Sequence, residues 1–283
     1  MNKPIKCFIV EGEDRDYRFI NEMIRTFFKG RYESITICLP AGQNIYMLYN
    51  RMKEDRFETD LIELLREDNK QAEKLLDGVD RQSIDEIYLF FDYDIHQNNL
   101  PTGQDPHEVL EKMLLFYDNE TENGKLYISY PMVEALYDYQ DGYCEPVTYC
   151  RYPLDMIREY KTKSGQRNPH ASRHLLKYED WRMILSVFGL RIQCLFDADR
   201  IDYSIYSKEV SAESIFHYQK RFINQDNSVF VLSAFPEFLL DYFKKDFWVK
   251  HIIRHKNKYD HCPKEKDINI PALWPGLTGR NKG

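Results

Sequence analysis

The amino-acid sequence predicts an α/β fold in which a mostly parallel β-sheet is flanked by helices. In the first half of the chain, short apolar runs alternate with segments whose apolar residues recur at helical spacing. Strands are expected at residues 6–10, 34–39, 86–91 and 125–130, and helices between them at 16–28, 44–52, 59–79 and 107–118. Strands of about six residues that alternate with helices form parallel sheets, because each connecting helix packs back onto one face of the sheet.

The second half of the chain has a different pattern. After about residue 145, helical spacing dominates at 154–163, 173–189, 211–223 and from 236 onward, and one strand pattern occurs at 228–233. We therefore expect a sheet domain at 1–145 and a mainly helical accessory region at 146–283, and strand 228–233 could rejoin the first sheet. The basic stretch 158–177 contains Gly, Pro and Ser, which favours a loop there.

The composition indicates a folded protein without a membrane span. Of the 283 residues, 43% are hydrophobic and 14% are aromatic, which is enough for a sizeable core. The longest apolar runs fall well short of the about 20 residues that a membrane-spanning helix needs, and the N-terminus lacks the pattern of a signal peptide. The six cysteines are scattered, which favours reduced thiols and a cytoplasmic location. No glycine-rich phosphate loop of the Walker type occurs, so ATP hydrolysis is not expected.

Charge is distributed unevenly along the chain. Residues 1–150 contain 16 Lys and Arg against 30 Asp and Glu, a net charge of −14, and residues 151–283 contain 23 against 16, a net charge of +7. An acidic half beside a basic half suits a metal site next to a polyanion-binding surface, and it equally suits two lobes that attract each other. The residues expected to bind nucleic-acid phosphates are Lys244, Lys245, Lys250, Arg254, Lys256 and Lys258. An ordinary solvated helix face is the alternative for these side chains.

Acidic residues follow three of the four predicted strands. Glu11 follows the first strand, Asp92 and Asp94 follow the third, and Glu134 lies shortly after the fourth. Because the carboxyl ends of parallel strands lie at one edge of a sheet, these four carboxylates are expected to converge. Carboxylate oxygens are ligands that Mg²⁺ prefers, and a cation offsets the repulsion between neighbouring acids. The alternatives are an Asp-rich turn after the third strand and, for Glu134, an acid in the first turn of a helix.

The order strand–Glu–Gly, strand–Asp–x–Asp and strand–Ser–x–Pro–x–x–Glu, carried by IVEGED, FDYD and SYPMVE, resembles the Toprim domain. The resemblance covers roughly residues 4–137 and is greatest for the stand-alone Toprim nucleases of phage defence, such as the PARIS effector and OLD-family relatives. It implies a Toprim-like sheet with a basic, largely helical accessory region. It further implies that Glu11 is the catalytic acid/base or a metal ligand, and that Asp92 and Asp94 hold Mg²⁺, with Mn²⁺ as a substitute.

A second metal position is implied at Glu134 and Asp14. Many nuclease members of the family carry a second acid four residues after the Glu, and this chain has Arg15 there. Asp14 is the substitute that we choose, and helix capping is the alternative role for both Asp14 and Asp16 because acids are favoured in the first turn of a helix.

The function that the resemblance implies is a Mg²⁺-dependent endonuclease, a hydrolase that cleaves RNA, with transfer RNA as the attractive substrate, or DNA. It would act in antiviral defence by abortive infection, as a toxic effector controlled by a partner ABC-type ATPase, and a homodimer is compatible with it. One alternative is a non-catalytic Toprim-like binding or regulatory subunit, which the Arg15 departure favours. Another is a phosphatase with Asp92 as nucleophile, although FDYDIH lacks the Thr or Val usual after the second Asp.

Overall fold

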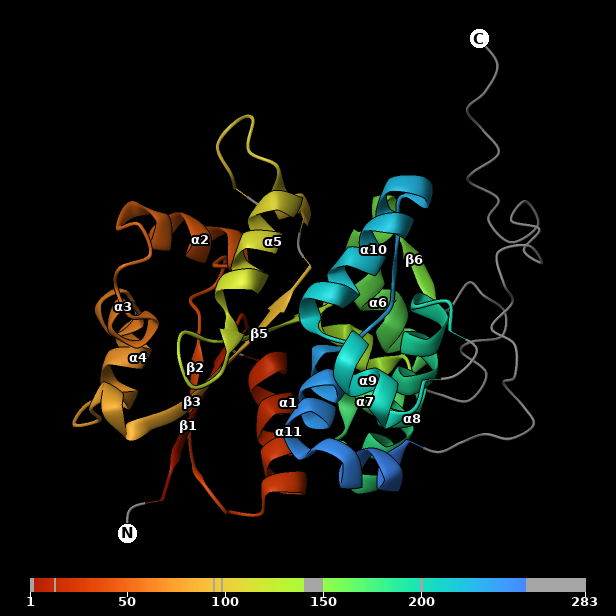
Figure 1. Cartoon of the computed structure of the whole chain (residues 1–283), viewed down its shortest axis with the longest axis horizontal. Helices are drawn as coiled ribbons and strands as arrows, with labels where there is room; N and C mark the ends of the chain where they lie inside the picture. The colour runs from red at the N-terminus through yellow and green to blue at the C-terminus, as the bar shows by residue number, and fades with distance from the viewer. Residues whose placement is uncertain are drawn as a thin grey trace.

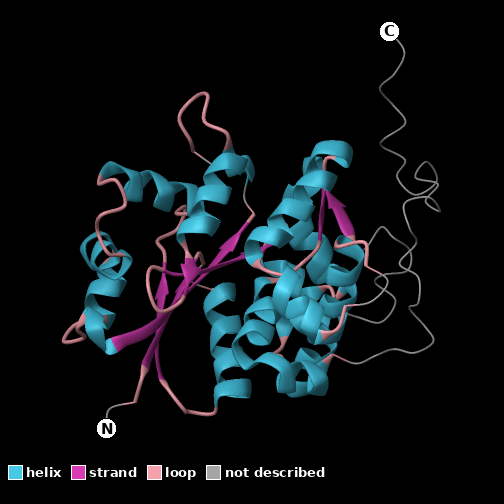
Figure 2. Ribbon diagram, viewed as in Figure 1, coloured by secondary structure: helices cyan, strands magenta, loops and turns pink. Residues whose placement is uncertain are grey.

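A five-stranded sheet forms the centre of the protein's first half. The computed structural model describes residues 3–12, 14–93, 95–97, 99–139, 150–198 and 201–252. The strands lie in the order β2-β1-β3-β5-β4. Figure 2 shows the strands in magenta, with helices in cyan around them. Their bounds are β1 (Ile5–Val10), β2 (Glu33–Cys38), β3 (Ile84–Asp92), β4 (Asp118–Asn119) and β5 (Gly124–Ser129). All neighbours are parallel except the short β4, which is antiparallel to β5. The expected α/β class, with its mostly parallel sheet flanked by helices, is confirmed.

Helices cover both faces of this sheet. In Figure 1, α2 to α5 lie on one side, and α1 and α11 lie on the other. The bounds are α1 (Arg15–Met23), its π-helical continuation η1 (Ile24–Phe28), α2 (Ile45–Glu54), α3 (Leu61–Asp68), α4 (Lys70–Leu75) and α5 (Pro106–Phe116), with short 3₁₀ helices η2 (Arg81–Ser83), η3 (Ile95–Gln97) and η4 (Val133–Tyr137). The single helix predicted at 59–79 is broken at Asn69, because its side chain caps α4 and donates a hydrogen bond to the carbonyl of Cys38 at 2.8 Å.

The second half is mainly helical, as expected. Its elements are β6 (Arg151–Pro153), η6 (Leu154–Met156), α6 (Ile157–Arg167), α7 (Pro169–Arg173), α8 (Tyr178–Leu195), α9 (Tyr203–Glu209), α10 (Ala212–Asp226), β7 (Ser228–Phe230) and α11 (Ala234–His251). β7 pairs with β6 in a separate antiparallel sheet, and an isolated bridge joins Leu232 to Tyr130 just after β5. The boundary expected at residue 145 falls outside the described residues.

The basic stretch 158–177 is mostly helical, although its composition favours a loop. It contains most of α6, all of α7 and the turn into α8. Asn168 caps α7 by accepting a hydrogen bond from the backbone N–H of Ala171, and Pro169 occupies the first helical position, where its missing N–H costs nothing. The Asn168 side chain also donates to the carbonyl of Tyr137 at 2.8 Å, which attaches α7 to η4.

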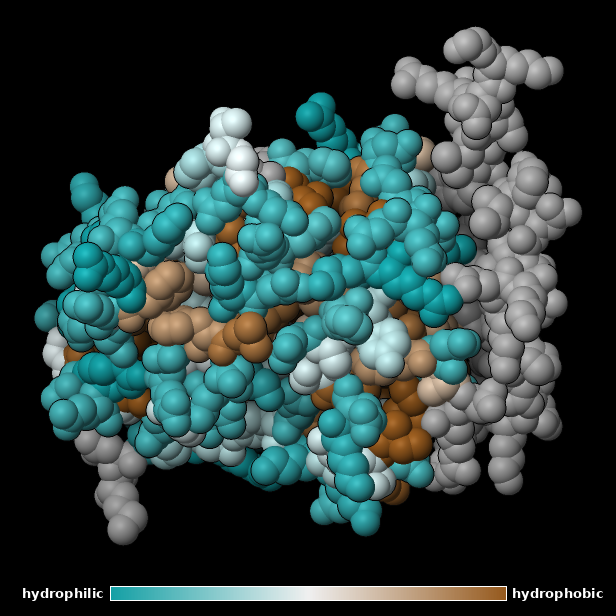
Figure 3. All heavy atoms as spheres, turned by 45° about the horizontal axis from the view of Figure 1, so that its top comes forward, coloured by the Kyte–Doolittle hydropathy of each residue, from teal (hydrophilic) through white to brown (hydrophobic). Residues whose placement is uncertain are grey.

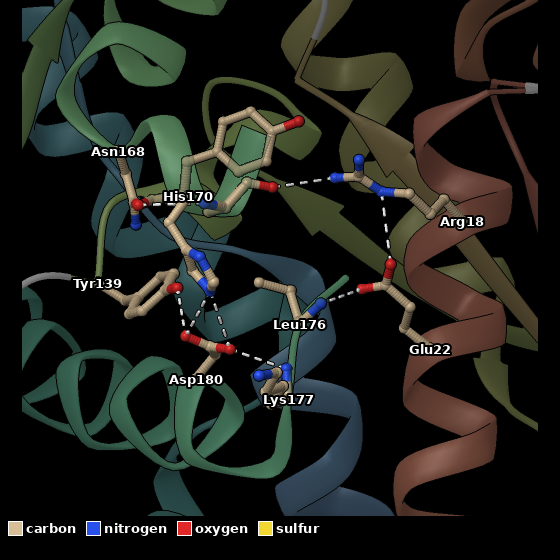
Figure 4. Close-up of polar contacts among 10 residues, drawn as sticks. Arg18, Glu22, Tyr139, Asn168, His170, Leu176, Lys177 and Asp180 are labelled. Atoms are coloured by element: carbon tan, nitrogen blue, oxygen red, sulfur yellow. Dashed lines mark hydrogen bonds and ion pairs between the residues drawn. The ribbon is translucent and has the colours of Figure 1, made fainter. Parts of the chain in front are cut away.

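The accessory region packs directly against α1. Arg18 of α1 donates to the carbonyl of Ala171 at 3.1 Å, and Glu22 accepts from the backbone N–H of Leu176 at 3.0 Å (Figure 4). Glu22 is buried, and this burial raises the pKa of its carboxyl. Side chains of α1 therefore hold the accessory region against the sheet domain through hydrogen bonds to its backbone carbonyl and N–H groups.

Aromatic side chains join α11 to the sheet. The ring of Phe238 contacts Phe8 of β1, Tyr88 and Phe90 of β3, and Tyr127 of β5, with ring centroids 4.7 to 5.9 Å apart. One continuous core of buried residues extends from the sheet into the accessory region. Hydrophilic residues cover most of the face in Figure 3, with hydrophobic residues showing through in smaller areas. None of the described helices has the length and apolar character that crossing a membrane requires.

Candidate functional site

Two of the predicted site residues are in contact at the carboxyl ends of neighbouring strands. β1 and β3 pair in parallel with Val10 opposite Phe90, so the residues that follow them lie at one edge of the sheet. The backbone N–H of Asp92 donates to Glu11 Oε2 at 3.2 Å. Both side chains are half-buried. Asp94, the second acid of the Asp-x-Asp pair, lies outside the described residues.

Glu134 lies in η4, beyond the carboxyl end of β5, and is only 3% exposed. The sequence offered the first turn of a helix as an alternative setting for Glu134, and Glu134 does lie in the first turn of the 3₁₀ helix η4. The Glu134 carboxylate forms an ion pair with Arg15, through Oε1 and Nη1, and Lys161 Nζ of α6 lies 3.9 Å from the same oxygen. A buried carboxylate is stable in its charged form only beside opposite charge, and these two side chains provide it.

The Arg15–Glu134 pair spans the carboxyl edge of the sheet. Arg15 begins α1, directly after β1, whereas Glu134 follows β5. Since β3 lies between β1 and β5, the pair connects elements that follow the strands on either side of β3. Ser129, the residue of β5 opposite Asp92, is buried and accepts a hydrogen bond from the backbone N–H of Ala234 at 3.2 Å. Glu11, Asp92 and Glu134 therefore belong to one edge, and Ser129 anchors α11 there.

The turn between β1 and α1 buries Asp16 rather than Asp14. Asp14 is exposed at the N-cap position, and its side chain makes no capping hydrogen bond. Asp16 is 7% exposed, and a Cβ atom on Gly12 would lie 2.6 Å from its Oδ2, so only glycine leaves room for this carboxylate. Burial raises the pKa of Asp16 to about 7, while Arg15 and Lys161 act in the opposite direction. From the sequence, Asp16 was expected only as a helix-capping acid, and its enclosure depends on the tight turn at Gly12.

Glu11 and Asp92 are of the residue type that a hard cation prefers, at the strand ends where the sequence predicts one. Both offer carboxylate oxygens, and Mg²⁺ commonly uses one or two carboxylates and keeps several waters. Within the described ranges, no three His, Cys, Asp or Glu side chains are grouped closely enough to hold a metal ion. The predicted site acids are instead divided between two places. Glu11 contacts Asp92, whereas Glu134 is paired with Arg15 and lies near Lys161.

The described basic residues predicted to bind nucleic acid, Lys244, Lys245 and Lys250, do not lie at this edge. α11 starts beside Ser129 at the carboxyl end of β5, and Asp241 pairs with Lys125 near the amino end of β5 at 2.8 Å. The helix therefore runs toward the amino edge of the sheet, and the exposed Lys244, Lys245 and Lys250 lie beyond Asp241. Arg254, Lys256 and Lys258 lie outside the described residues. Phe247 and Trp248 of this stretch are buried.

α6 brings basic residues to the carboxyl edge instead. The helix packs against η4, and Lys161, 60% exposed, approaches Glu134. Arg158, one turn earlier on α6, is also exposed. Stretch 158–177 is basic in the sequence, but its position could not be predicted, because it depends on how α6 packs against η4.

No protein-family model, no curated protein and no solved structure matches this chain.

Proposed function

We propose that this protein is a Mg²⁺-dependent endonuclease of the Toprim type that cleaves RNA or DNA. The observation that carries the proposal is the hydrogen bond from the Asp92 backbone N–H to Glu11 Oε2 at adjacent strand ends. It supports an arrangement in which Glu11 and Asp92, the first acid of the Asp–x–Asp pair, belong to one site rather than to two unrelated acidic turns. In parallel sheets, the carboxyl edge is also where ligands bind.

In this proposal, Glu11 and Asp92 have separate roles. The Asp92 N–H fixes Glu11 Oε2, which orients the Glu11 carboxylate to accept a proton from an attacking water. The Asp92 carboxylate, with Asp94 two residues later, would hold Mg²⁺ or Mn²⁺. When bound, the metal supplies charge stabilisation for the phosphate oxygens and lowers the pKa of a bound water. Glu134 and Asp14 are further candidate ligands.

The resemblance to stand-alone Toprim effectors extends the proposal to antiviral defence. The protein would then be a cytoplasmic toxic effector that an ABC-type ATPase partner holds in check, with transfer RNA as the favoured substrate. The acidic first half and the accessory helices are the surfaces that we assign to partner docking.

The second candidate function is a non-catalytic Toprim-like binding or regulatory subunit. The ion pair between Arg15 and the buried Glu134 favours it, because this acid is already neutralised by a side chain of the protein itself. A subunit of this kind needs no metal for its structure at this edge.

Expression of the full chain with its Glu11→Gln and Asp92→Asn variants tests the proposal, with sequencing of RNA ends and inspection of DNA integrity as the readouts. Glu73→Gln is the matched control, because Glu73 is an exposed acid on α4, a helix that packs against the edge strand β2. We expect cleavage in the wild type and the control, and none in the two site variants. Cleavage that persists in Glu11→Gln contradicts the proposal, and no cleavage in any protein with Mg²⁺ or Mn²⁺ favours the binding subunit.

A further inference from the structure

Glu134 is a buried acid that lies beside two cations open to solvent. Its side chain is 3% exposed, whereas that of its ion-pair partner Arg15 is 36% exposed. Lys161 Nζ lies 3.9 Å from Glu134 Oε1, and the Lys161 side chain is 60% exposed. Two positive charges therefore share one negative charge, and the excess positive charge is carried by the side chains that reach solvent.

One flank of α6 extends this positive charge. Two other cations of the helix are engaged elsewhere, because Lys163 pairs with Glu159 at 2.7 Å and Arg167 binds a buried acid. Arg158 and Lys161 are both exposed and lie three residues apart, so they project from the same side of the helix. The two side chains thus continue the positive charge along the surface of the accessory region.

This positive surface adjoins the proposed cleavage site. Arg15 follows Glu11 by four residues, and α6 packs against η4, which lies just beyond the carboxyl end of β5. Residues 1–150, which include the sheet, hold 16 Lys and Arg against 30 Asp and Glu and so repel a polyanion. A nucleic acid that approaches this edge therefore needs cations close to the site, and α1 and α6 provide them.

We propose that Arg15, Arg158 and Lys161 form the surface that binds the phosphodiester backbone of a nucleic acid. The inference rests on the proposed function, because it names the part of the molecule that would hold the substrate strand beside Glu11 and Asp92. Binding at this surface needs no metal ion. It also assigns the role that the sequence predicts for the lysines of α11 to residues of α1 and α6.

The three side chains suit phosphate groups in different ways. Within the part of the chain that the structure describes, Arg15 makes a hydrogen bond only through Nη1, so its other N–H groups are available to phosphate oxygens. Arg158 supplies a second planar guanidinium, and Lys161 supplies a compact charge on a flexible stem. Contacts of this kind do not depend on base sequence, and they weaken with salt because each neutralised phosphate releases counterions.

Binding of fluorescein-labelled nucleic acid to the full chain tests this surface. The probes are an RNA hairpin and a DNA hairpin of matching sequence, titrated in EDTA at several salt concentrations so that no metal takes part. Arg158→Ala and Lys161→Ala should each weaken binding about three- to tenfold, and each should reduce the slope of log affinity against log salt by about one. Both side chains are exposed, so neither substitution disturbs the core.

Arg15→Lys separates geometry from charge. The variant keeps a positive charge beside the buried Glu134, which preserves the fold, but it loses the planar set of N–H groups. We expect weaker binding with a salt slope close to that of the wild type. Lys163→Ala, on the other flank of α6, and Lys245→Ala, on α11, are the matched controls and should bind like the wild type.

Weaker binding in all three surface variants, with wild-type binding in both controls, supports the inference. It is overturned if any surface variant binds like the wild type, if Lys245→Ala loses as much affinity as Lys161→Ala, or if the wild type binds neither hairpin. Cleavage that depends on Glu11, found together with any of these results, means that the proposed function stands and only this inference fails. Weaker binding in the surface variants without Glu11-dependent cleavage in any protein means that this inference stands and the binding subunit replaces the nuclease.

Discussion

Glu22 of α1 accepts a hydrogen bond from the backbone N–H of Leu176 at 3.0 Å, although the two residues are 154 positions apart in the chain. Arg18 Nε lies 3.6 Å from the other oxygen of the same carboxylate (Figure 4). This contact secures the turn before α8 on the sheet domain. A helix-borne acid therefore helps to fix the accessory region in place.

Glu22→Ala should lower the free energy of unfolding by about 1 to 3 kcal/mol, because it leaves the buried N–H of Leu176 without its acceptor. Glu22→Gln should cost less, since its amide oxygen still accepts this bond. Urea denaturation measures both, with Glu67→Ala on an exposed position of α3 as the control. Equal effects of Glu22→Ala and Glu67→Ala would show that the contact contributes nothing.

The buried Asp138 depends on Arg167 in a similar way. Asp138 is 2% exposed and accepts from Arg167 Nη2 at 2.5 Å and Nε at 3.0 Å, and from the Tyr160 hydroxyl at 2.7 Å. Arg167→Ala should cost about 3 to 5 kcal/mol, because it leaves a buried charge without its counter-ion. Thermal unfolding measures this loss of stability. The exposed pair Arg182–Glu179 is the comparison, and Arg182→Ala should cost less than about 1 kcal/mol. A similar small loss for Arg167→Ala would mean that water replaces the guanidinium.

Glu237 should make stability depend on pH. Its side chain is buried on α11 near Asp241, and its Oε1 has no hydrogen-bond partner among the described residues. Burial raises the pKa of Glu237 well above its ordinary value, and the negative charge of Asp241 raises it further, while Lys125 lowers it. A carboxyl whose pKa is raised by folding holds its proton more tightly in the folded state, so the free energy of unfolding falls as pH rises past the ordinary pKa of Glu.

Glu237→Gln removes this titration. The variant's free energy of unfolding should therefore fall less than that of the wild type between about pH 5 and about pH 8, as measured by urea denaturation. Glu73→Gln, at an exposed position of α4, should leave the wild-type dependence unchanged. A Glu237→Gln profile parallel to that of the wild type would show that Glu237 does not control this part of the pH dependence.

Gly12→Ala should destabilise the protein by about 1 to 3 kcal/mol, because the added Cβ atom would lie 2.6 Å from Asp16 Oδ2. If the clash is the cause, the substitution should cost much less in an Asp16→Ala background, and a double-mutant cycle measures that difference. Gly165→Ala in α6 is the control, since its Cβ atom would lie 3.6 Å from Ser172 Cβ, an ordinary contact. Independent effects of the Gly12 and Asp16 substitutions would contradict the clash.

The strands were predictable because each is a local pattern. The run Cys7–Val10 is apolar throughout and buried on both faces, which is what a central parallel strand requires. The spacing of apolar residues predicted the wrong element where a single side chain changes the chain direction. Asn69 is an example, because it divides the one helix predicted at 59–79 into α3 and α4. The prediction was wrong again at 158–177, where Gly, Pro and Ser occur inside or at the start of helices.

The candidate site was predictable only in part. Glu11 comes directly after β1 and Asp92 ends β3, so the parallel pairing of these two strands is enough to predict where both residues lie. The partner of Glu134 could not be inferred, because Arg15 and Glu134 are 119 residues apart and meet only through the order of the strands. The direction of α11, which takes Lys244 and Lys245 toward the amino edge, likewise depends on how that helix packs on β5.

The packing of Phe238 has a consequence for how the protein is made. This ring covers aromatic residues of β1, β3 and β5, yet it belongs to the last helix that the structure describes. While the ribosome synthesises the chain from its N-terminus, the sheet has an uncovered aromatic face until α11 emerges, and exposed faces of this kind are where partly made proteins aggregate or recruit chaperones. The sheet that positions Glu11 and Asp92 is therefore fully covered only late in synthesis.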